Sequence, residues 1–232
     1  MNYAVILSGG VGSRMRQDGF PKQYIEIYGK PILIYTLERF NNNALVDKII
    51  IVAAEQWREK IFEWIDIYGI NKFVEIANAG NTRQESILNG LEVCAKYSVE
   101  SSDNVIIHDA VRPLLSDLLI SKCLSALKNS EGCMPVLPIN DTVYQSLNGN
   151  EITNLLDRKT LFAGQAPEAF HLHRYLEINR FATKTELANI RGSSEIAYKN
   201  GLDVTLIAGE EMNFKLTTPV DLERFKAILR GE

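Results

Sequence analysis

Short, continuously apolar runs rich in β-branched residues recur along the chain and constrain its fold more than any other feature. They lie at residues 4–7, 48–53, 73–77, 104–108 and 133–137. Strands that are covered on both faces have this unbroken apolar character, whereas half-exposed strands alternate apolar and polar residues. Between the runs, apolar side chains recur at helical spacing over residues 57–68 and 87–94. Thr218-Pro219 is typical of a helix start, and we expect this last helix to end near Leu229.

The alternation of strands and helices predicts an α/β fold, with a Rossmann-like, mostly parallel, twisted sheet and helices on both of its faces. Nothing in the 232 residues resembles a linker, a repeat or a low-complexity stretch, so we expect a single domain over residues 1–232. In such sheets, ligands bind beyond the carboxyl ends of the strands. The loops that follow the apolar runs are therefore the places where a site is expected.

Charge and composition exclude several function classes. The formal net charge of −4 argues against nucleic acid or an anionic membrane surface as partner, because both require a positive field. The three cysteines, Cys94, Cys123 and Cys133, lack metal-ligand or redox spacing and are interpreted as buried reduced thiols. No apolar run is long enough for a signal peptide or a membrane span, so a cytoplasmic location is expected.

Residues 141–156 interrupt the alternation of strands and helices. Asn148-Gly149, flanked by strand-like residues, is a strong hairpin signal. Because an isolated two-stranded hairpin is marginally stable in water, we expect a protruding β-hairpin arm, assigned to residues 138–164, that packs against a second subunit. An edge hairpin of the same sheet is the alternative.

The first apolar run leads into a glycine-rich loop, "LSGGVGSRMRQDGFPKQY" (residues 7–24). Its glycines allow backbone N–H groups to approach a ligand and form a nest for phosphate oxygens, and two cations follow. These residues are Gly9, Gly10, Gly12, Arg14 and Lys22. The loop contains no Walker A string, and Met15 stands where a dinucleotide fingerprint needs its third glycine. The pattern favours a polyphosphate ligand over a nicotinamide cofactor, with a purely structural turn as the alternative.

Five segments, in order along the chain, resemble the cytidylyltransferases that make CDP-methylerythritol for isoprenoid synthesis and CDP-ribitol for teichoic acid. The segments are "SGGVGSRM…FPKQY", "AGNTRQESILNG" (79–90), "HDAVRP" (108–113), "LLDRKTLFAGQAPEAF" (155–170) and "NFKLTTPVDL" (213–222). Five ordered motifs are far more specific than any one of them, and together they extend over nearly the whole chain.

The resemblance implies an enzyme, a CTP-dependent cytidylyltransferase that joins CMP to a small polyol phosphate and releases pyrophosphate. The acceptor phosphate is largely dianionic at neutral pH and needs no base, so catalysis depends on positioning and on charge stabilisation. The implied cofactor is Mg²⁺ held mainly by the phosphates of CTP, and no residue of the chain is assigned as a metal ligand. The implied assembly is a homodimer through the 138–164 arm.

The resemblance also assigns residues to roles. The expected catalytic cations are Arg14, Lys22 and Lys215. The expected CTP-binding residues are Ser8, Gly9, Gly10, Gly12, Arg14, Lys22, Gly80, Asn81, Ser86, Asp109, Ala110, Arg112 and Lys215. The expected acceptor-binding residues are Asp109, Arg158 from the neighbouring subunit, and Arg191. His108 is interpreted as a packed strand residue, and His171 and His173 as surface histidines.

Two positions on the acceptor side depart from the family pattern. Ala166 replaces the threonine of the family's Thr-Pro-Gln, and Arg191-Gly192 replaces a Thr-Asp pair. Arg191 is either a surface residue or takes over phosphate binding through its bidentate fork. Gly9 and the Gly-Gln before Ala166 favour ribitol 5-phosphate, or a related polyol phosphate, as the acceptor.

Three other interpretations remain. The first is 2-C-methyl-D-erythritol 4-phosphate as the acceptor. The second is a sugar-1-phosphate nucleotidyltransferase that uses another nucleotide. The third is a catalytically inactive nucleotide-binding regulatory module, which the intact cations at 14, 22 and 215 disfavour.

Overall fold

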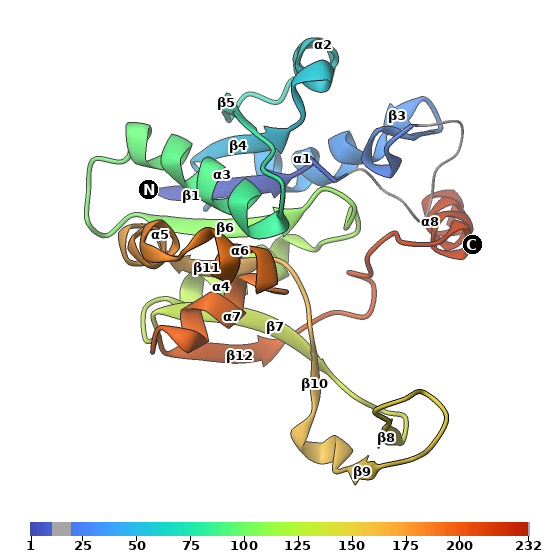
Figure 1. Ribbon diagram of the computed structural model, residues 1–232. Coiled ribbons are helices and arrows are strands. Elements are labelled where there is room, and N and C mark those ends of the chain that lie inside the picture. Colours follow the sequence, from blue (N-terminus) through green and yellow to red (C-terminus); the bar gives the residue numbers. More distant parts are fainter. Residues whose placement is uncertain (11–19, 232) are drawn as a thin grey trace.

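A computed structural model describes residues 1–10 and 20–231, and its core is one eight-stranded sheet (Figure 1). The strands are β1 (Asn2–Leu7), β4 (Lys48–Ala53), β5 (Phe73–Asn78), β6 (Asn104–Asp109), β7 (Gly132–Pro138), β10 (Phe162–Gly164), β11 (Glu168–His171) and β12 (Val204–Ala208). Their order across the sheet is β10-β7-β11-β6-β1-β4-β5, and β12 also pairs with β7. All five predicted strands are present.

The sheet is mostly parallel, as predicted. β1 pairs in parallel with β4 and β6, β4 pairs in parallel with β5, and β12 pairs in parallel with β7. The sequence did not indicate β11, which lies antiparallel between β6 and β7. β10 and β11 both pair with β7, but their registers differ by two residues, so the chain between Gly164 and Glu168 bulges out of the ladder.

Helices cover both faces of the sheet, which explains why the strands are apolar throughout. Ala4 and Ile6 of β1 belong to one core, whereas Tyr3 and Val5 belong to the other, and all four side chains are fully buried. The first core is closed by α1 (Ile32–Asn42), α2 (Arg58–Tyr68) and α4 (Asp117–Ala126). The second is closed by α3 (Arg83–Tyr97), α5 (Leu172–Phe181), α6 (Lys184–Asn189) and α7 (Ser193–Lys199).

The last helix, α8 (Pro219–Arg230), begins where the sequence predicts. Thr218 is its N-cap, Asp221 completes a capping box, and Pro219 occupies the first turn. The helix ends at Gly231, which has the left-handed φ of 80° that glycine adopts readily. Its residues Leu222 and Phe225 pack on Ile32 at the start of α1, so the last helix lies against the first. Shorter elements are η1 (Lys22–Tyr24), β2 (Glu26–Ile27), β3 (Lys30–Pro31), η2 (Glu55–Trp57) and η3 (Arg158–Thr160).

The predicted hairpin is present and projects away from the sheet (Figure 1). β8 (Val143–Gln145) and β9 (Asn154–Leu156) pair antiparallel, and β10 then returns to β7. The connection is not a two-residue Asn-Gly turn but an eight-residue loop over 146–153. The side chain of Asn148 organises this loop, since its Oδ1 accepts from the backbone N–H groups of Asn150 (3.0 Å) and Glu151 (3.1 Å).

The three cysteines are buried and free, as predicted. Burial raises the pKa of the Cys94 thiol, so this group stays protonated. Within residues 1–10 and 20–231, no helix has the length and apolar character needed to cross a membrane.

Candidate active site

Three loops meet at the carboxyl edge of the parallel strands, where the topology predicts a ligand site. The backbone N–H of Ser8, just after β1, donates to Val52 of β4 (2.8 Å). The N–H of Ala79, after β5, donates to Ala53 (3.0 Å), and the N–H of Ala110, after β6, donates to Leu7 (3.0 Å). These bonds fix the loops to the ends of neighbouring strands.

Two glycines allow close packing here, one between the loops after β1 and β5 and one between the loop after β5 and the start of α3. A Cβ atom at Gly9 would lie 2.5 Å from the Cβ of Ala79, and one at Gly80 would lie 2.4 Å from the Cβ of Glu85. Both distances are far below an ordinary contact, so neither position has room for a side chain. Gly10 differs, because no described atom lies within 4 Å of a Cβ built there.

Residues of η1 hold the start of the glycine-rich loop. The Ser8 hydroxyl donates to the Tyr24 hydroxyl (2.9 Å), which in turn donates to the Ser8 carbonyl (3.0 Å). Gln23 Nε2 donates to the carbonyls of Ser8 (2.6 Å) and Gly10 (2.9 Å). Burial raises the pKa of Tyr24 to about 12, so its hydroxyl remains a donor. Gly12 and Arg14 lie outside the described residues.

The second predicted nucleotide segment forms the N-terminus of α3. Thr82 caps the helix by accepting from the N–H of Glu85 (3.1 Å). Ser86 Oγ accepts from the N–H of Gly80 (3.0 Å), and Glu85 Oε2 accepts from the N–H of Asn81 (2.7 Å). Gly80 and Ser86 are therefore joined by a hydrogen bond in the turn that leads into the helix, and Asn81 is exposed beside them.

Two of the three predicted catalytic cations come together in the fold. Lys22 Nζ donates to the carbonyl of Leu216 (2.8 Å), 194 residues further along the chain. The neighbouring Lys215 donates from Nζ to Asp109 Oδ2 (2.8 Å). Arg112 also faces this carboxylate, with Nε 3.6 Å from Asp109 Oδ2. The segment before α8 thus brings Lys215 to the end of β6 and to Lys22.

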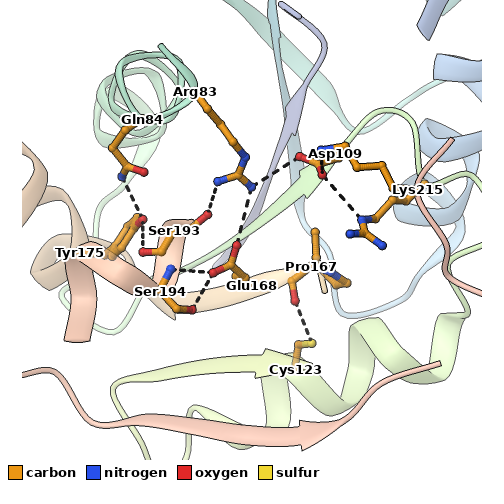
Figure 2. Close-up of polar contacts among 12 residues, drawn as sticks. Arg83, Gln84, Asp109, Cys123, Pro167, Glu168, Tyr175, Ser193, Ser194 and Lys215 are labelled. Carbon is orange, nitrogen blue, oxygen red and sulfur yellow. Dashed lines mark hydrogen bonds and ion pairs between the residues drawn. The ribbon is translucent and has the colours of Figure 1, made fainter. Parts of the chain in front are cut away.

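Arg83 is a member of this cluster that the sequence analysis missed. Its NH1 donates to Ser193 Oγ (2.8 Å), and its NH2 lies 3.5 Å from Asp109 Oδ1 and 3.7 Å from Glu168 Oε1 (Figure 2). Arg83 lies within the second matched segment, residues 79–90, and this position was the only indication in the sequence that it belongs to the site. Nothing in the sequence, however, indicates that its side chain reaches the end of β6.

The cluster of Arg83, Asp109, Arg112, Glu168 and Lys215 holds more positive than negative charge. Burial alone would raise the pKa of Asp109, but the positive charges of Arg83, Lys215 and Arg112 outweigh it and hold this pKa well below its usual range. Burial opposes ionisation of Arg83, yet the carboxylates of Asp109 and Glu168 keep its pKa raised. Three cations against two carboxylates leave a net charge that suits a phosphate.

A cavity of about 630 Å³ lies beside the cluster, a size typical of small-molecule sites. One part of its wall is charged and another is apolar. The residues that line it include Arg83, Asp109, Arg112, Met134, Gly164, Gln165, Ala166, Glu168, Arg191, Gly192, Ser194, Glu195, Tyr198, Val204, Leu206 and Lys215. Both positions that depart from the family pattern, Ala166 and Arg191, are among them.

The predicted acceptor-side residues occupy different places. Arg191 is exposed at the cavity, and its backbone N–H donates to Glu195 Oε2 (2.7 Å). Among the described residues, none forms a hydrogen bond or ion pair with the Arg191 guanidinium. The carbonyl of Ala166 accepts from Asn213 Nδ2 (2.6 Å). Arg158 lies on the arm, where it donates to the carbonyl of Asn140, and it is not among the residues that line this cavity.

The histidines take no part in the cluster. His108 is fully buried, its Nε2 donates to the carbonyl of Arg112 (3.1 Å), and its ring packs on Phe40, so its interpretation as a packed strand residue is confirmed. Burial lowers the pKa of His108 to about 4. His173 is exposed as predicted, whereas His171 is half-buried and contacts Asn104 Oδ1 (2.9 Å). Across the described part of the chain, no three His, Cys, Asp or Glu side chains form a metal-binding group.

Comparisons with known proteins extend over nearly the whole chain. Residues 2–231 match the family described as IspD, 2-C-methyl-D-erythritol 4-phosphate cytidylyltransferase. A ribitol-5-phosphate cytidylyltransferase from Vibrio parahaemolyticus is 36% identical over 231 residues, which are 99% of this chain and 96% of the relative. One from Streptococcus agalactiae serotype III is 31% identical over 98% of this chain and 95% of its own. The crystal structure of 2-C-methyl-D-erythritol 4-phosphate cytidylyltransferase from Francisella tularensis is 28% identical, with a TM-score of 0.80 over 97% of both chains.

Proposed function

The chain belongs to the 2-C-methyl-D-erythritol 4-phosphate cytidylyltransferase family and is a cytidylyltransferase, and from this premise we propose that it transfers CMP from CTP to ribitol 5-phosphate. The observation that carries this acceptor is the similarity, over nearly the whole length, to relatives named for ribitol 5-phosphate. 2-C-Methyl-D-erythritol 4-phosphate is the second candidate, favoured by the family description and by the Francisella structure.

The proposed reaction is a displacement at phosphorus. A non-bridging oxygen of the acceptor phosphate attacks the α-phosphorus of CTP and forms the new P–O bond. The bond from this phosphorus to the oxygen that bridges to the β-phosphate breaks, and pyrophosphate leaves with the electron pair. The acceptor phosphate is largely dianionic at neutral pH, so no side chain has to take a proton. This agrees with the environment of His108, which is buried and directed at a backbone carbonyl.

We propose that fixed cations allow the two phosphates to approach. Lys22 and Lys215 are anchored by the carbonyl of Leu216 and by Asp109, so each ammonium group is held in place before the substrates arrive. In the proposal they stabilise the charge that develops on CTP, together with Arg14 of the glycine-rich loop. In the same proposal, Asp109 and Arg112 contact the nucleotide, and Asp109 also contacts the acceptor.

We propose Mg²⁺ as the cofactor. This ion usually binds through one or two carboxylates together with substrate phosphates. Asp109 is a carboxylate at the cluster, and no group of three ligating side chains accompanies it within the described residues. Asp109 therefore fits a Mg²⁺ ion whose other ligands are mainly the phosphates of CTP. When bound, it supplies positive charge to the phosphates during the displacement.

The arm is the proposed interface of a homodimer in the cytoplasm. Leu147, Ile152 and Leu155 expose 84%, 68% and 61% of their surface, which is unusual for large apolar side chains gathered on one element. Arg158 extends from the same arm and does not line the cavity of its own chain. We propose that it binds the acceptor phosphate in the neighbouring subunit.

A pyrophosphate-release assay tests the proposal. Each of CTP, ATP, GTP and UTP is paired with ribitol 5-phosphate, 2-C-methyl-D-erythritol 4-phosphate and other pentitol, tetritol and glycerol phosphates. We expect the highest kcat/KM for CTP with ribitol 5-phosphate. A higher value with 2-C-methyl-D-erythritol 4-phosphate would replace the proposed acceptor by the second candidate. Absence of pyrophosphate from every pair would contradict catalysis itself.

A further inference from the structure

Glu168 is a buried carboxylate at the wall of the cavity, and it has no role in the proposed displacement. It is the first residue of β11 and is only 5% exposed. Its Oε2 accepts from both the backbone N–H (2.7 Å) and the hydroxyl (2.6 Å) of Ser194 (Figure 2). These two bonds fix the orientation of the carboxylate.

The second oxygen of this carboxylate is not satisfied in the same way. The nearest cation to Glu168 Oε1 is Arg83 NH2, at 3.7 Å, which is too long for a hydrogen bond. Among residues 1–10 and 20–231, no donor forms a hydrogen bond with Oε1. Because Glu168 also lines the cavity, this oxygen is available to a molecule bound there.

Arg83 presents the complementary group. Its NH1 is engaged by Ser193 Oγ (2.8 Å), which holds the guanidinium in position. Its NH2 lies between Asp109 Oδ1 (3.5 Å) and Glu168 Oε1 (3.7 Å), and neither contact is short. Two hydrogen bonds of about 2.8 Å can span 3.7 Å at an acute angle, so an oxygen atom beside this contact can reach both groups.

We propose that Glu168 and Arg83 together bind one hydroxyl group of the acceptor's polyol chain. The hydroxyl donates a hydrogen bond to Glu168 Oε1 and accepts one from Arg83 NH2. Only a group that is both donor and acceptor satisfies the two partners at once, and a hydroxyl is such a group. This inference rests on the proposed class of acceptor, a polyol phosphate.

The consequence is selectivity between acceptors. A hydrogen atom in place of that hydroxyl leaves a buried carboxylate oxygen without a donor and leaves Arg83 NH2 with only its long contact to Asp109, which is costly. Sites that bind a substrate hydroxyl in this way reject analogues that lack it. The pair therefore favours an acceptor that carries this hydroxyl over one that is deoxygenated at that position.

The test measures kcat/KM for ribitol 5-phosphate and for its four singly deoxygenated analogues. In the wild-type enzyme, we expect one analogue to lose about 10- to 150-fold, the range for a hydrogen bond to a charged group. In Glu168→Gln, ribitol 5-phosphate itself loses a similar factor, while that analogue loses little more. The KM for CTP stays unchanged in both proteins. Equal losses for every analogue in Glu168→Gln, or a rise in the KM for CTP, would overturn the proposal.

Glu186→Gln is the matched control. Glu186 accepts with Oε2 from the backbone N–H (2.7 Å) and the hydroxyl (2.8 Å) of Thr183, the same pair of bonds that Glu168 makes with Ser194. It completes the capping box of α6, whose N-cap is Thr183, and it is not among the residues that line the cavity. We expect it to preserve the wild-type ranking of the acceptors. If the control changed this ranking as Glu168→Gln does, the effect would be one of stability and the proposal would be wrong.

Two further measurements test the inference if Glu168→Gln folds poorly or if the enzyme prefers another acceptor. Ser194→Ala removes one of the bonds that orient Glu168, and we expect a smaller loss on the same hydroxyl even if Glu168→Gln folds poorly. If the wild-type enzyme prefers another polyol phosphate, the proposed acceptor is wrong, and the deoxygenated series of that acceptor then tests Glu168. A wild-type enzyme that is indifferent to every hydroxyl of its preferred acceptor would contradict the inference alone.

Discussion

Gly9→Ala tests whether the loops after β1 and β5 form the nucleotide side of the site by packing directly on each other. The added Cβ would lie 2.5 Å from the Cβ of Ala79, and the next atoms are Ala79 Cα at 3.5 Å and the Val52 carbonyl oxygen at 3.9 Å. One atom therefore causes nearly all of the clash. The two loops have to separate by about 1 Å to reach an ordinary carbon–carbon contact.

The expected cost follows from this geometry. Overpacking of a close contact costs about 1–3 kcal/mol, which corresponds to a fall in Tm of about 2–4 °C per kcal/mol for a chain of this length. Ala79→Gly removes the clashing atom, and the remaining distances in the double variant are ordinary. Ala79→Gly alone is expected to cost about 0.4–1 kcal/mol through the added freedom of the unfolded chain.

Urea unfolding and the KM for CTP are measured for the wild type, both single variants and the double variant. We expect Gly9→Ala to lower the free energy of unfolding and to raise the KM for CTP. The double variant should recover at least about 1 kcal/mol relative to the sum of the single effects, as residues in contact do. Gly10→Ala is the control for stability, because its Cβ meets no described atom within 4 Å. Additivity of the two single effects within about 0.5 kcal/mol would refute direct packing of the loops.

Four further predictions concern catalysis, assembly, pH and metal. Lys22→Ala should lower kcat by about 10²- to 10³-fold, as loss of one fixed donor to a developing charge does, while cooperative urea unfolding is retained; near-normal turnover would remove Lys22 from the catalytic residues. When the Arg158→Ala and Lys22→Ala proteins are mixed and their subunits pair at random, half of the dimers contain one subunit of each kind, and each of these has one complete site. The mixture should therefore regain about a quarter of wild-type activity. No recovery after subunit exchange would contradict an arm that acts in the neighbouring subunit. Burial lowers the pKa of His108 to about 4, so as the pH falls this side chain is protonated in the unfolded state before it is protonated in the folded state. Its contribution to the free energy of unfolding is therefore fully present above pH 6.5 and is lost as the pH falls to 4. Between pH 6.5 and pH 4 we expect the free energy of unfolding, measured with urea at each pH, to fall by about 3 kcal/mol from this residue, and His108→Gln should make this fall smaller. If the variant lost stability with pH as steeply as the wild type, His108 would not be the cause. EDTA should abolish pyrophosphate release without lowering the Tm of the free enzyme, and a large fall in Tm would instead indicate a metal held by the protein.

The sequence alone determined the elements whose cause is local. The five apolar runs became strands because both faces of the sheet are buried, and the pattern of each run already requires this. Thr218-Pro219 starts α8 because the cap and the fixed φ of proline act within one turn. The hairpin was predicted for the same reason, and Asn148 makes hydrogen bonds within its loop.

The tertiary structure decided which of these local elements meet. Lys22 contacts Leu216 across 194 residues, and Lys215 contacts Asp109 across 106. β11 was not evident in the sequence, because its residues Glu168–His171 show neither a continuous apolar run nor strict alternation, yet it places Glu168 opposite Arg83. The position of a charged side chain depends on the packing of the sheet and helices around it, and no periodicity along the chain encodes that packing. The sequence therefore determined the five predicted strands and the cap of α8, whereas only the fold brought Arg83, Asp109 and Glu168 to one cavity.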